Sequence, residues 1–157
     1  MWKNGFIIII LCGCCGYSTR SVLPSSYKTI SIPLVGNETV RPGIGDLLTN
    51  QLLDDFTKDR TLKIVGIDKA NLSLECKITN YDKSPQSYTA DQNVSTYKIT
   101  LGAEVKLNDQ VKSEEMWKND VSIFITYDNQ SETEDQGIDK SVKKLSQEIL
   151  RKVLTSW

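Results

Sequence analysis

The 157-residue chain contains no histidine. Histidine is the commonest general base and the commonest metal ligand in proteins, so its absence excludes Ser-His and Cys-His nucleophile pairs and histidine metal sites. A glycine-rich phosphate loop is also missing, because Gly43 and Gly45 come before a predicted helix without the lysine and further glycines of such a loop. These absences predict a protein that is not an enzyme and that carries no metal or cofactor.

The chain also has no excess of charge of either sign. Lysine and arginine number 19 and aspartate and glutamate 20, for a formal net charge of −1. A balanced chain has no overall attraction to nucleic acid, so recognition of an acidic ligand would need a local basic patch. The length suits one domain.

The longest apolar run lies near the N-terminus, at residues 6–11, after Lys3. It is far shorter than the roughly 20 apolar residues that span a bilayer. A basic residue, a short apolar core and then small residues are typical of a secretory signal. The alternative interpretation is a buried strand followed by ordinary cysteines.

The segment Leu11-Cys12-Gly13-Cys14 resembles the bacterial lipobox. By that resemblance, Cys14 is the lipid attachment site, with diacylglyceryl on its sulfur and an acyl chain on its new amine. Two or more acyl chains give lasting membrane attachment. We therefore expect a signal peptide at 1–13, a lipidated tether at 14–26 and one domain at 27–157. Lipidation of Cys15 instead would place Cys12 at the position that favours leucine.

Cys76 lies in the apolar row of an alternating stretch, which predicts a buried thiol. A disulfide between Cys15 and Cys76 is the alternative in an oxidising periplasm.

The hydrophobic pattern predicts strands and helices in the order strand, helix, three strands, helix. We expect strands at 27–35, 70–79, 97–107 and 111–127, helices at 42–58 and from 138 onward, and polar loops at 80–93 and 128–137; residues 62–67 begin a further strand region. Each strand has one apolar row and each helix one apolar stripe. This predicts an α+β two-layer sandwich, with a mostly antiparallel four-stranded sheet and both helices on one face. The other face would be polar and uncovered, with Lys98 and Lys106 on it.

Several motifs together resemble the LptE family of lipopolysaccharide-assembly lipoproteins of the Gram-negative outer membrane. They are Cys14-Cys15-Gly16-Tyr17, Ile30-x-Ile32-Pro33-Leu34-x-Gly36-Asn37, Arg41-Pro42-Gly43, Asp59-Arg60-x-Leu62, Ala70-Asn71-Leu72-x-Leu74 and Tyr81-x-x-x-Pro85-x-x-Tyr88. The resemblance covers nearly all of the chain after Cys14. The sequence departs from the family at Cys15, where glycine is usual.

The resemblance implies a noncatalytic plug inside the LptD β-barrel that helps deliver lipopolysaccharide to the cell surface. A polar open face would suit the polar lumen of such a barrel. Lysine binds phosphate as a point charge, so Lys98 and Lys106 are the predicted lipopolysaccharide contacts. The alternative is that they only solubilise this face.

A second function class stays open: a periplasmic lipoprotein that builds a secretion pore or activates a peptidoglycan synthase. A pore former would assemble into a ring. The absence of an aspartate directly after Cys14 favours the periplasmic side of the outer membrane over the inner membrane.

Overall fold

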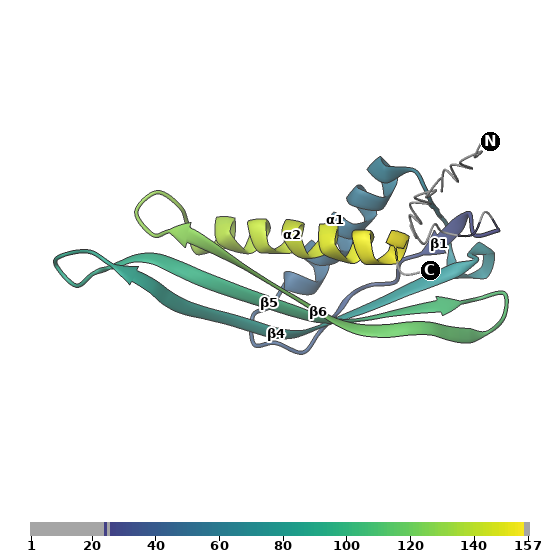
Figure 1. Cartoon of the computed structure of the whole chain (residues 1–157), viewed down its shortest axis with the longest axis horizontal. Coiled ribbons are helices and arrows are strands. Elements are labelled where there is room, and N and C mark those ends of the chain that lie inside the picture. Colours follow the sequence, from purple (N-terminus) through teal and green to yellow (C-terminus); the bar gives the residue numbers. More distant parts are fainter. Residues whose placement is uncertain (1–23, 25, 156–157) are drawn as a thin grey trace, which may run out of the picture.

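The computed structural model describes residue 24 and residues 26–155. Its elements are β1 (Thr29–Ser31), β2 (Gly36–Asn37), α1 (Ile44–Asp59), β3 (Lys63–Ile64), the short 3-10 helix η1 (Ile67–Lys69), β4 (Leu72–Tyr88), β5 (Val94–Asp109), β6 (Glu114–Asp128) and α2 (Glu134–Thr155). The long strands β4, β5 and β6 give the molecule its long axis, and both helices lie on one side of them (Figure 1).

The sheet is mixed and has six strands among the described residues, so the prediction of an antiparallel four-stranded sheet is wrong. Its order is β3-β1-β4-β5-β6, and β2 also pairs with β4. The pairs β4–β5 and β5–β6 are antiparallel, as predicted, whereas β1 and β2 run parallel to β4 and β3 runs parallel to β1.

One predicted strand became two because of Pro33. The pairing of β1 with β4 ends at Ser31 with Ser73 and resumes only where Gly36 of β2 faces Lys77. Proline has no N–H to donate to a ladder, so the chain leaves the sheet edge at this point.

The predicted loop at 80–93 is also wrong, because β4 continues to Tyr88 and pairs with β5 as far as Val94. Register shifts follow Ile78, Pro85 and Ser87, and the shift at Pro85 accommodates a residue that cannot donate to the ladder. This part of the hairpin extends beyond the helices (Figure 1). Beyond Lys83 its side chains are mostly polar because no helix covers either face there, and that composition resembles a loop.

Both predicted helices form, with different starting points. α1 begins at Ile44, after Gly43 at φ 81°, a left-handed conformation that favours glycine. α2 begins at Glu134, four residues before the predicted start. The Thr133 backbone N–H donates to Gln136 Oε1 (2.8 Å), and the Gln136 N–H donates to Thr133 Oγ1 (3.3 Å). This reciprocal capping box starts the helix inside the segment predicted to be a loop.

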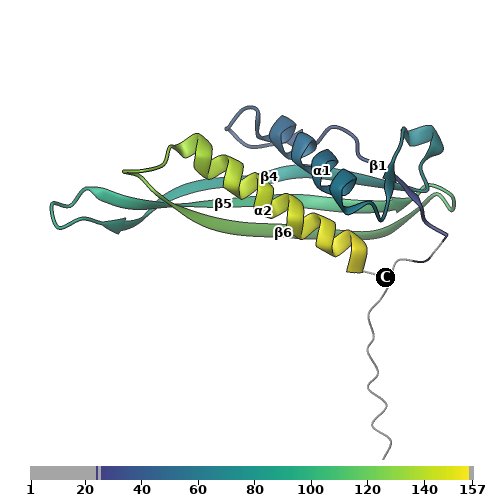
Figure 2. The same cartoon turned by 90° about the horizontal axis from the view of Figure 1, so that it is seen from above.

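The prediction that both helices cover one face is confirmed (Figure 2). The apolar stripe of α1 is buried at Ile44, Leu48, Leu52 and Phe56, and that of α2 at Ile138, Val142, Leu145, Ile149 and Val153. They pack on the apolar rows of the sheet, including Leu72, Leu74, Ile78, Ile99, Leu101, Val105 and Leu107, all fully or almost fully buried. The opposite face of the sheet carries no helix within the described part of the chain.

Candidate functional site

The candidate site is the uncovered face of the sheet, which we call the open face. It is formed by the alternate residues of β4, β5 and β6 that point away from the helices, among them Lys77, Glu104 and Lys118. Lys77 Nζ lies 3.1 Å from Glu38 Oε1 and 4.0 Å from Glu104 Oε1, and Lys118 Nζ lies 2.7 Å from Glu104 Oε2. These charges therefore form a chain of ion pairs across the three strands and the turn after β2.

The hydrogen bond between Lys118 and Glu104 favours the charged forms of these two groups. The hydrogen bond from Lys118 is the main cause that lowers the pKa of Glu104, and the same bond raises the pKa of Lys118. Lys118 is exposed and Glu104 is half-buried, so solvent still reaches the pairs, screens them and limits what they add to stability. Their effect is to leave little unbalanced charge on this part of the open face.

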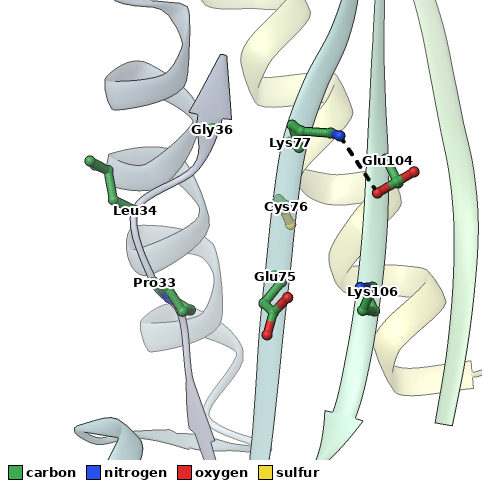
Figure 3. Close-up of a pocket in the computed structure, with 8 residues that line it drawn as sticks. All are labelled: Pro33, Leu34, Gly36, Glu75, Cys76, Lys77, Glu104 and Lys106. Atoms are coloured by element: carbon green, nitrogen blue, oxygen red, sulfur yellow. Dashed lines mark ion pairs between the residues drawn. The ribbon is translucent and has the colours of Figure 1, made fainter. Parts of the chain in front are cut away.

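A groove of about 360 Å³ opens where Pro33 interrupts the pairing of the edge (Figure 3). Leu34 lies at its rim with 72% of its surface exposed. The lining side chains come from the detour before β2 and from β4 and β5: Pro33, Leu34, Gly36, Glu75, Cys76, Lys77, Glu104 and Lys106. Two lysines and two glutamates balance each other, so the groove has no net charge.

The structure places Lys98 and Lys106 on the open face of β5, as predicted, but does not bring them together. They are eight positions apart on one strand, or about 27 Å at the usual rise. Lys106 lies in the groove with its Nζ 3.8 Å from Glu115 Oε2, whereas Lys98 has no ion pair with any described residue. The two lysines cannot bind a single phosphate group, and Lys98 is the more available.

A cluster that the sequence did not indicate joins the β4–β5 hairpin to the start of α2. Glu134 accepts hydrogen bonds from Tyr81 Oη (2.9 Å) and Lys83 Nζ (2.6 Å), and Arg41 Nη1 lies 3.7 Å away. The hydrogen bond from Lys83 is the main cause that lowers the pKa of Glu134, while burial, followed by Glu134, raises the pKa of Tyr81 to about 12. Lys83 Nζ also lies 4.4 Å from the centre of the Tyr97 ring, a cation–π contact. We call this set the Glu134 junction; its members are too far apart in sequence for any spacing rule to find.

A second polar contact fixes the beginning of the domain. Tyr27 Oη donates to Asp109 Oδ2 (2.5 Å), and Asp109 Oδ1 accepts from the N–H groups of Val111 (2.8 Å) and Lys112 (3.0 Å). Burial opposes ionisation of Asp109, but these hydrogen bonds outweigh it and lower its pKa. Asp109 therefore ties the entry to β1 to the β5–β6 turn.

The predicted lipid site, Cys14, and the neighbouring Cys15 lie outside the described residues. Cys76 is buried, as predicted, and burial raises the pKa of its thiol to about 12, which leaves it unreactive. Across residues 26–155, no helix is long and apolar enough to cross a membrane. No group of histidine, cysteine or acidic side chains within that range could hold a metal ion.

Solved structures similar to this chain include three proteins of low sequence identity. The protein CT253 from Chlamydia trachomatis has a TM-score of 0.62 at 8% identity, with 81% of this chain and 95% of that chain covered. Rare lipoprotein B from Shewanella oneidensis has a TM-score of 0.53 at 15% identity, with 80% and 95% covered. A minor lipoprotein from Acinetobacter baumannii has a TM-score of 0.56 at 15% identity, with 83% and 95% covered. At such low sequence identities, the structural likeness shows a shared fold and nothing more. A comparison with curated protein sequences found no match.

The family comparison is more specific. The LptE family model, described as lipopolysaccharide-assembly, matches residues 27–153, which is most of the chain. The match supports a general role in lipopolysaccharide assembly in a family of lipoproteins that are not enzymes. The chain therefore belongs to the LptE family.

Proposed function

We propose that this chain is an outer-membrane lipoprotein, anchored through Cys14, that plugs an LptD-type β-barrel and assists it in delivering lipopolysaccharide to the cell surface. The observation that carries the proposal is the family match over residues 27–153. Membership concerns lipopolysaccharide assembly in general, and the barrel partner is the specific step that we add.

The chemistry of the open face supports this step. The lumen of a large barrel is polar, and a surface that enters it must not leave charges without partners. Glu104 already pairs with Lys77 and Lys118, and Glu75 accepts a hydrogen bond from Asn108 Nδ2 (2.9 Å). The open face can therefore contact a polar barrel wall without leaving these charged groups unpaired. On the other side of the sheet, the helices cover the apolar core.

Purification from membranes tests the proposal. The chain, tagged at its C-terminus and extracted with mild detergent, should retain a large barrel protein whose electrophoretic mobility changes on heating. A matched purification of a tagged, unrelated outer-membrane lipoprotein supplies the control. Recovery of the chain from outer membranes without any such barrel would overturn the plug.

We further propose that Lys98 and Lys106 contact separate phosphate groups of lipopolysaccharide. The variant Lys98→Glu/Lys106→Glu should bind purified lipopolysaccharide about tenfold more weakly, since charge reversal replaces attraction with repulsion at both positions. Lys98→Glu alone should account for most of the loss, because Lys106 already has Glu115 nearby. The control variant Lys58→Glu/Lys143→Glu makes the same change at two exposed lysines of the helices, on the other side of the sheet. Unchanged affinity in the first variant would remove both residues from the site.

A further inference from the structure

Polar contacts gather three segments at one end of the molecule. Tyr27 binds Asp109, the N–H groups of Lys28 and Thr29 donate to Asn71 Oδ1 (3.1 and 3.2 Å), and the Gln110 N–H donates to the Asn71 carbonyl (2.8 Å). We call this set the entry end; it comprises residues 27–29, 63–71 and 109–112. The β4–β5 turn lies at the opposite end of the long axis (Figure 1).

The entry end exposes apolar side chains next to basic ones. Ile67 is 47% exposed and Val111 is 70% exposed, although both are branched aliphatic residues. Lys28, Lys63 and Lys69 are exposed and have no ion pair with any residue that the structure describes, which differs from the paired lysines of the open face. The backbone holds them together, because Thr29 of β1 faces Lys63 of β3, and Thr29 Oγ1 donates to the Lys69 carbonyl (3.3 Å).

The acids of the entry end do not cancel these lysines. Asp109 is buried, and its carboxylate is balanced by Lys112, whose Nζ lies 3.8 Å from Asp109 Oδ2 and 3.5 Å from Glu114 Oε1. Asp68 is the remaining exposed carboxylate of the set, against Lys28, Lys63 and Lys69. The surface at this end therefore has a positive excess beside two exposed apolar side chains.

We infer that the entry end is a membrane-contact surface, on which Lys28, Lys63 and Lys69 bind anionic phospholipid headgroups while Ile67 and Val111 enter the interface. This inference rests on the proposed anchor at Cys14. Residues 14–26 span at most about 45 Å when fully extended, whereas β4 alone is about 58 Å long. The tether therefore keeps the entry end within about 45 Å of the bilayer, whereas the β4–β5 turn, at the far end of the long axis, is under no such limit.

Exposed lysines beside aliphatic side chains suit the interface between water and an anionic membrane. Lysines near an anionic surface gain attraction that falls off within a Debye length, and aliphatic side chains gain from leaving water at the headgroup boundary. The contact would supplement the acyl chains and fix the orientation of the domain. With the entry end on the membrane, the long strands would point away from it, and the open face would not lie against the lipid.

Amine labelling of the mature protein tests the inference directly. The protein, purified from membranes, is placed in vesicles of phosphatidylglycerol and phosphatidylethanolamine, in phosphatidylcholine vesicles, or in detergent, and its lysines are acetylated with a water-soluble reagent and quantified by mass spectrometry. In the anionic vesicles the reactivity of Lys28, Lys63 and Lys69 should fall about threefold or more, and 1 M salt should restore much of it. The exposed Lys143 of α2 serves as the internal control and should not change.

Two variants separate the contributions. Ile67→Ser/Val111→Ser should restore part of the reactivity of Lys63 and Lys69 in anionic vesicles, whereas Val40→Ser, a change at a side chain that is 98% exposed between β2 and α1, should not. Protein that floats with the vesicles yet shows unchanged lysine reactivity would overturn the inference and leave the proposed anchor and barrel intact. Protein that does not float with the vesicles overturns the anchor and the inference together.

Discussion

The two faces of the central sheet differ in how they satisfy their side chains. On the helix face, apolar residues such as Leu74, Ile99 and Leu101 are almost completely buried beneath α1 and α2. On the open face, charged residues such as Lys77, Glu104 and Lys118 find partners in one another across the strands. Stability thus comes mainly from one face, and the other face is free to contact a partner. Substitutions on the two faces should separate these roles.

The largest effect is expected where α1 closes the core. Phe56→Ala removes a fully buried aromatic ring and should lower the free energy of unfolding by about 3–5 kcal/mol. Leu47→Ala, on the same helix at a side chain that is partly exposed, is the matched control and should cost less than about 1 kcal/mol. Urea denaturation of both variants checks this. Equal losses of unfolding free energy would mean that the buried side of α1 stabilises the fold no more than its exposed side does.

A smaller loss is expected at Gly137, where α2 lies close to the sheet. A Cβ at Gly137 would lie 2.8 Å from Tyr127 Cδ1 and 3.0 Å from Ile99 Cδ1, so Gly137→Ala forces buried side chains to move. The strain of overpacking, about 1–3 kcal/mol, exceeds the roughly 1 kcal/mol that alanine gains in a helix.

Thermal denaturation should therefore show a lower melting temperature for Gly137→Ala. The control is Gly66→Ala, where φ is −65° and no atom lies within 4 Å of the added Cβ, so it should be neutral or slightly stabilising. A rise in melting temperature for Gly137→Ala would contradict the close packing of α2 on β5 and β6.

The Glu134 junction gives a pH-dependent effect. Because the folded state lowers the pKa of Glu134, its contribution to stability is present above the unfolded value of about 4.3 and is lost as the pH falls through the folded value. Glu134→Gln should cost about 1–2 kcal/mol at pH 7 and progressively less below pH ~4.3.

Urea denaturation between pH 3 and 7 measures the difference between this variant and the native chain. Asp139→Asn, in the first turns of the same helix, controls for the loss of a negative charge near the helix N-terminus and should show a smaller and flatter difference. A constant difference across the range would mean that the contacts with Tyr81 and Lys83 do not depend on the charge of Glu134.

The smallest effect on stability is expected on the open face. Glu104→Gln removes the negative charge shared by Lys77 and Lys118, but all three groups are at least partly exposed, so solvent screens their ion pairs. Its denaturation curve should nearly overlay that of the native chain. A substantial loss would show that the ion pairs hold the sheet together, contrary to the division between the two faces.

The sequence predicted those features that repeat along the chain. The apolar rows of β4, β5 and β6 and the stripes of both helices follow periods of 2 and 3.6 residues, so the layers and the buried Cys76 could be expected. The start of α2 had a readable signal in Thr133 and Gln136, a capping box that the acidic composition obscured.

Other features depend on pairing between distant segments. Polar residues after Ile78 form a strand because they pair with β5. The hydrophobic pattern of the segment itself does not predict this pairing. The gap at Pro33 could be suspected from the proline, but the parallel partners of β1 and β2 could not. The Glu134 junction joins positions more than 50 residues apart through single contacts, and no local pattern encodes it.

Site-specific photo-crosslinking in intact cells tests the central claim most directly. A photoreactive residue at Ser122, exposed on the open face where it pairs with Gly102, is compared with one at Lys143, exposed on α2. The proposed plug predicts a crosslink to a large outer-membrane barrel from Ser122, with a much weaker one or none from Lys143. Crosslinks from Ser122 only to further copies of this chain, or to no barrel at all, would contradict it.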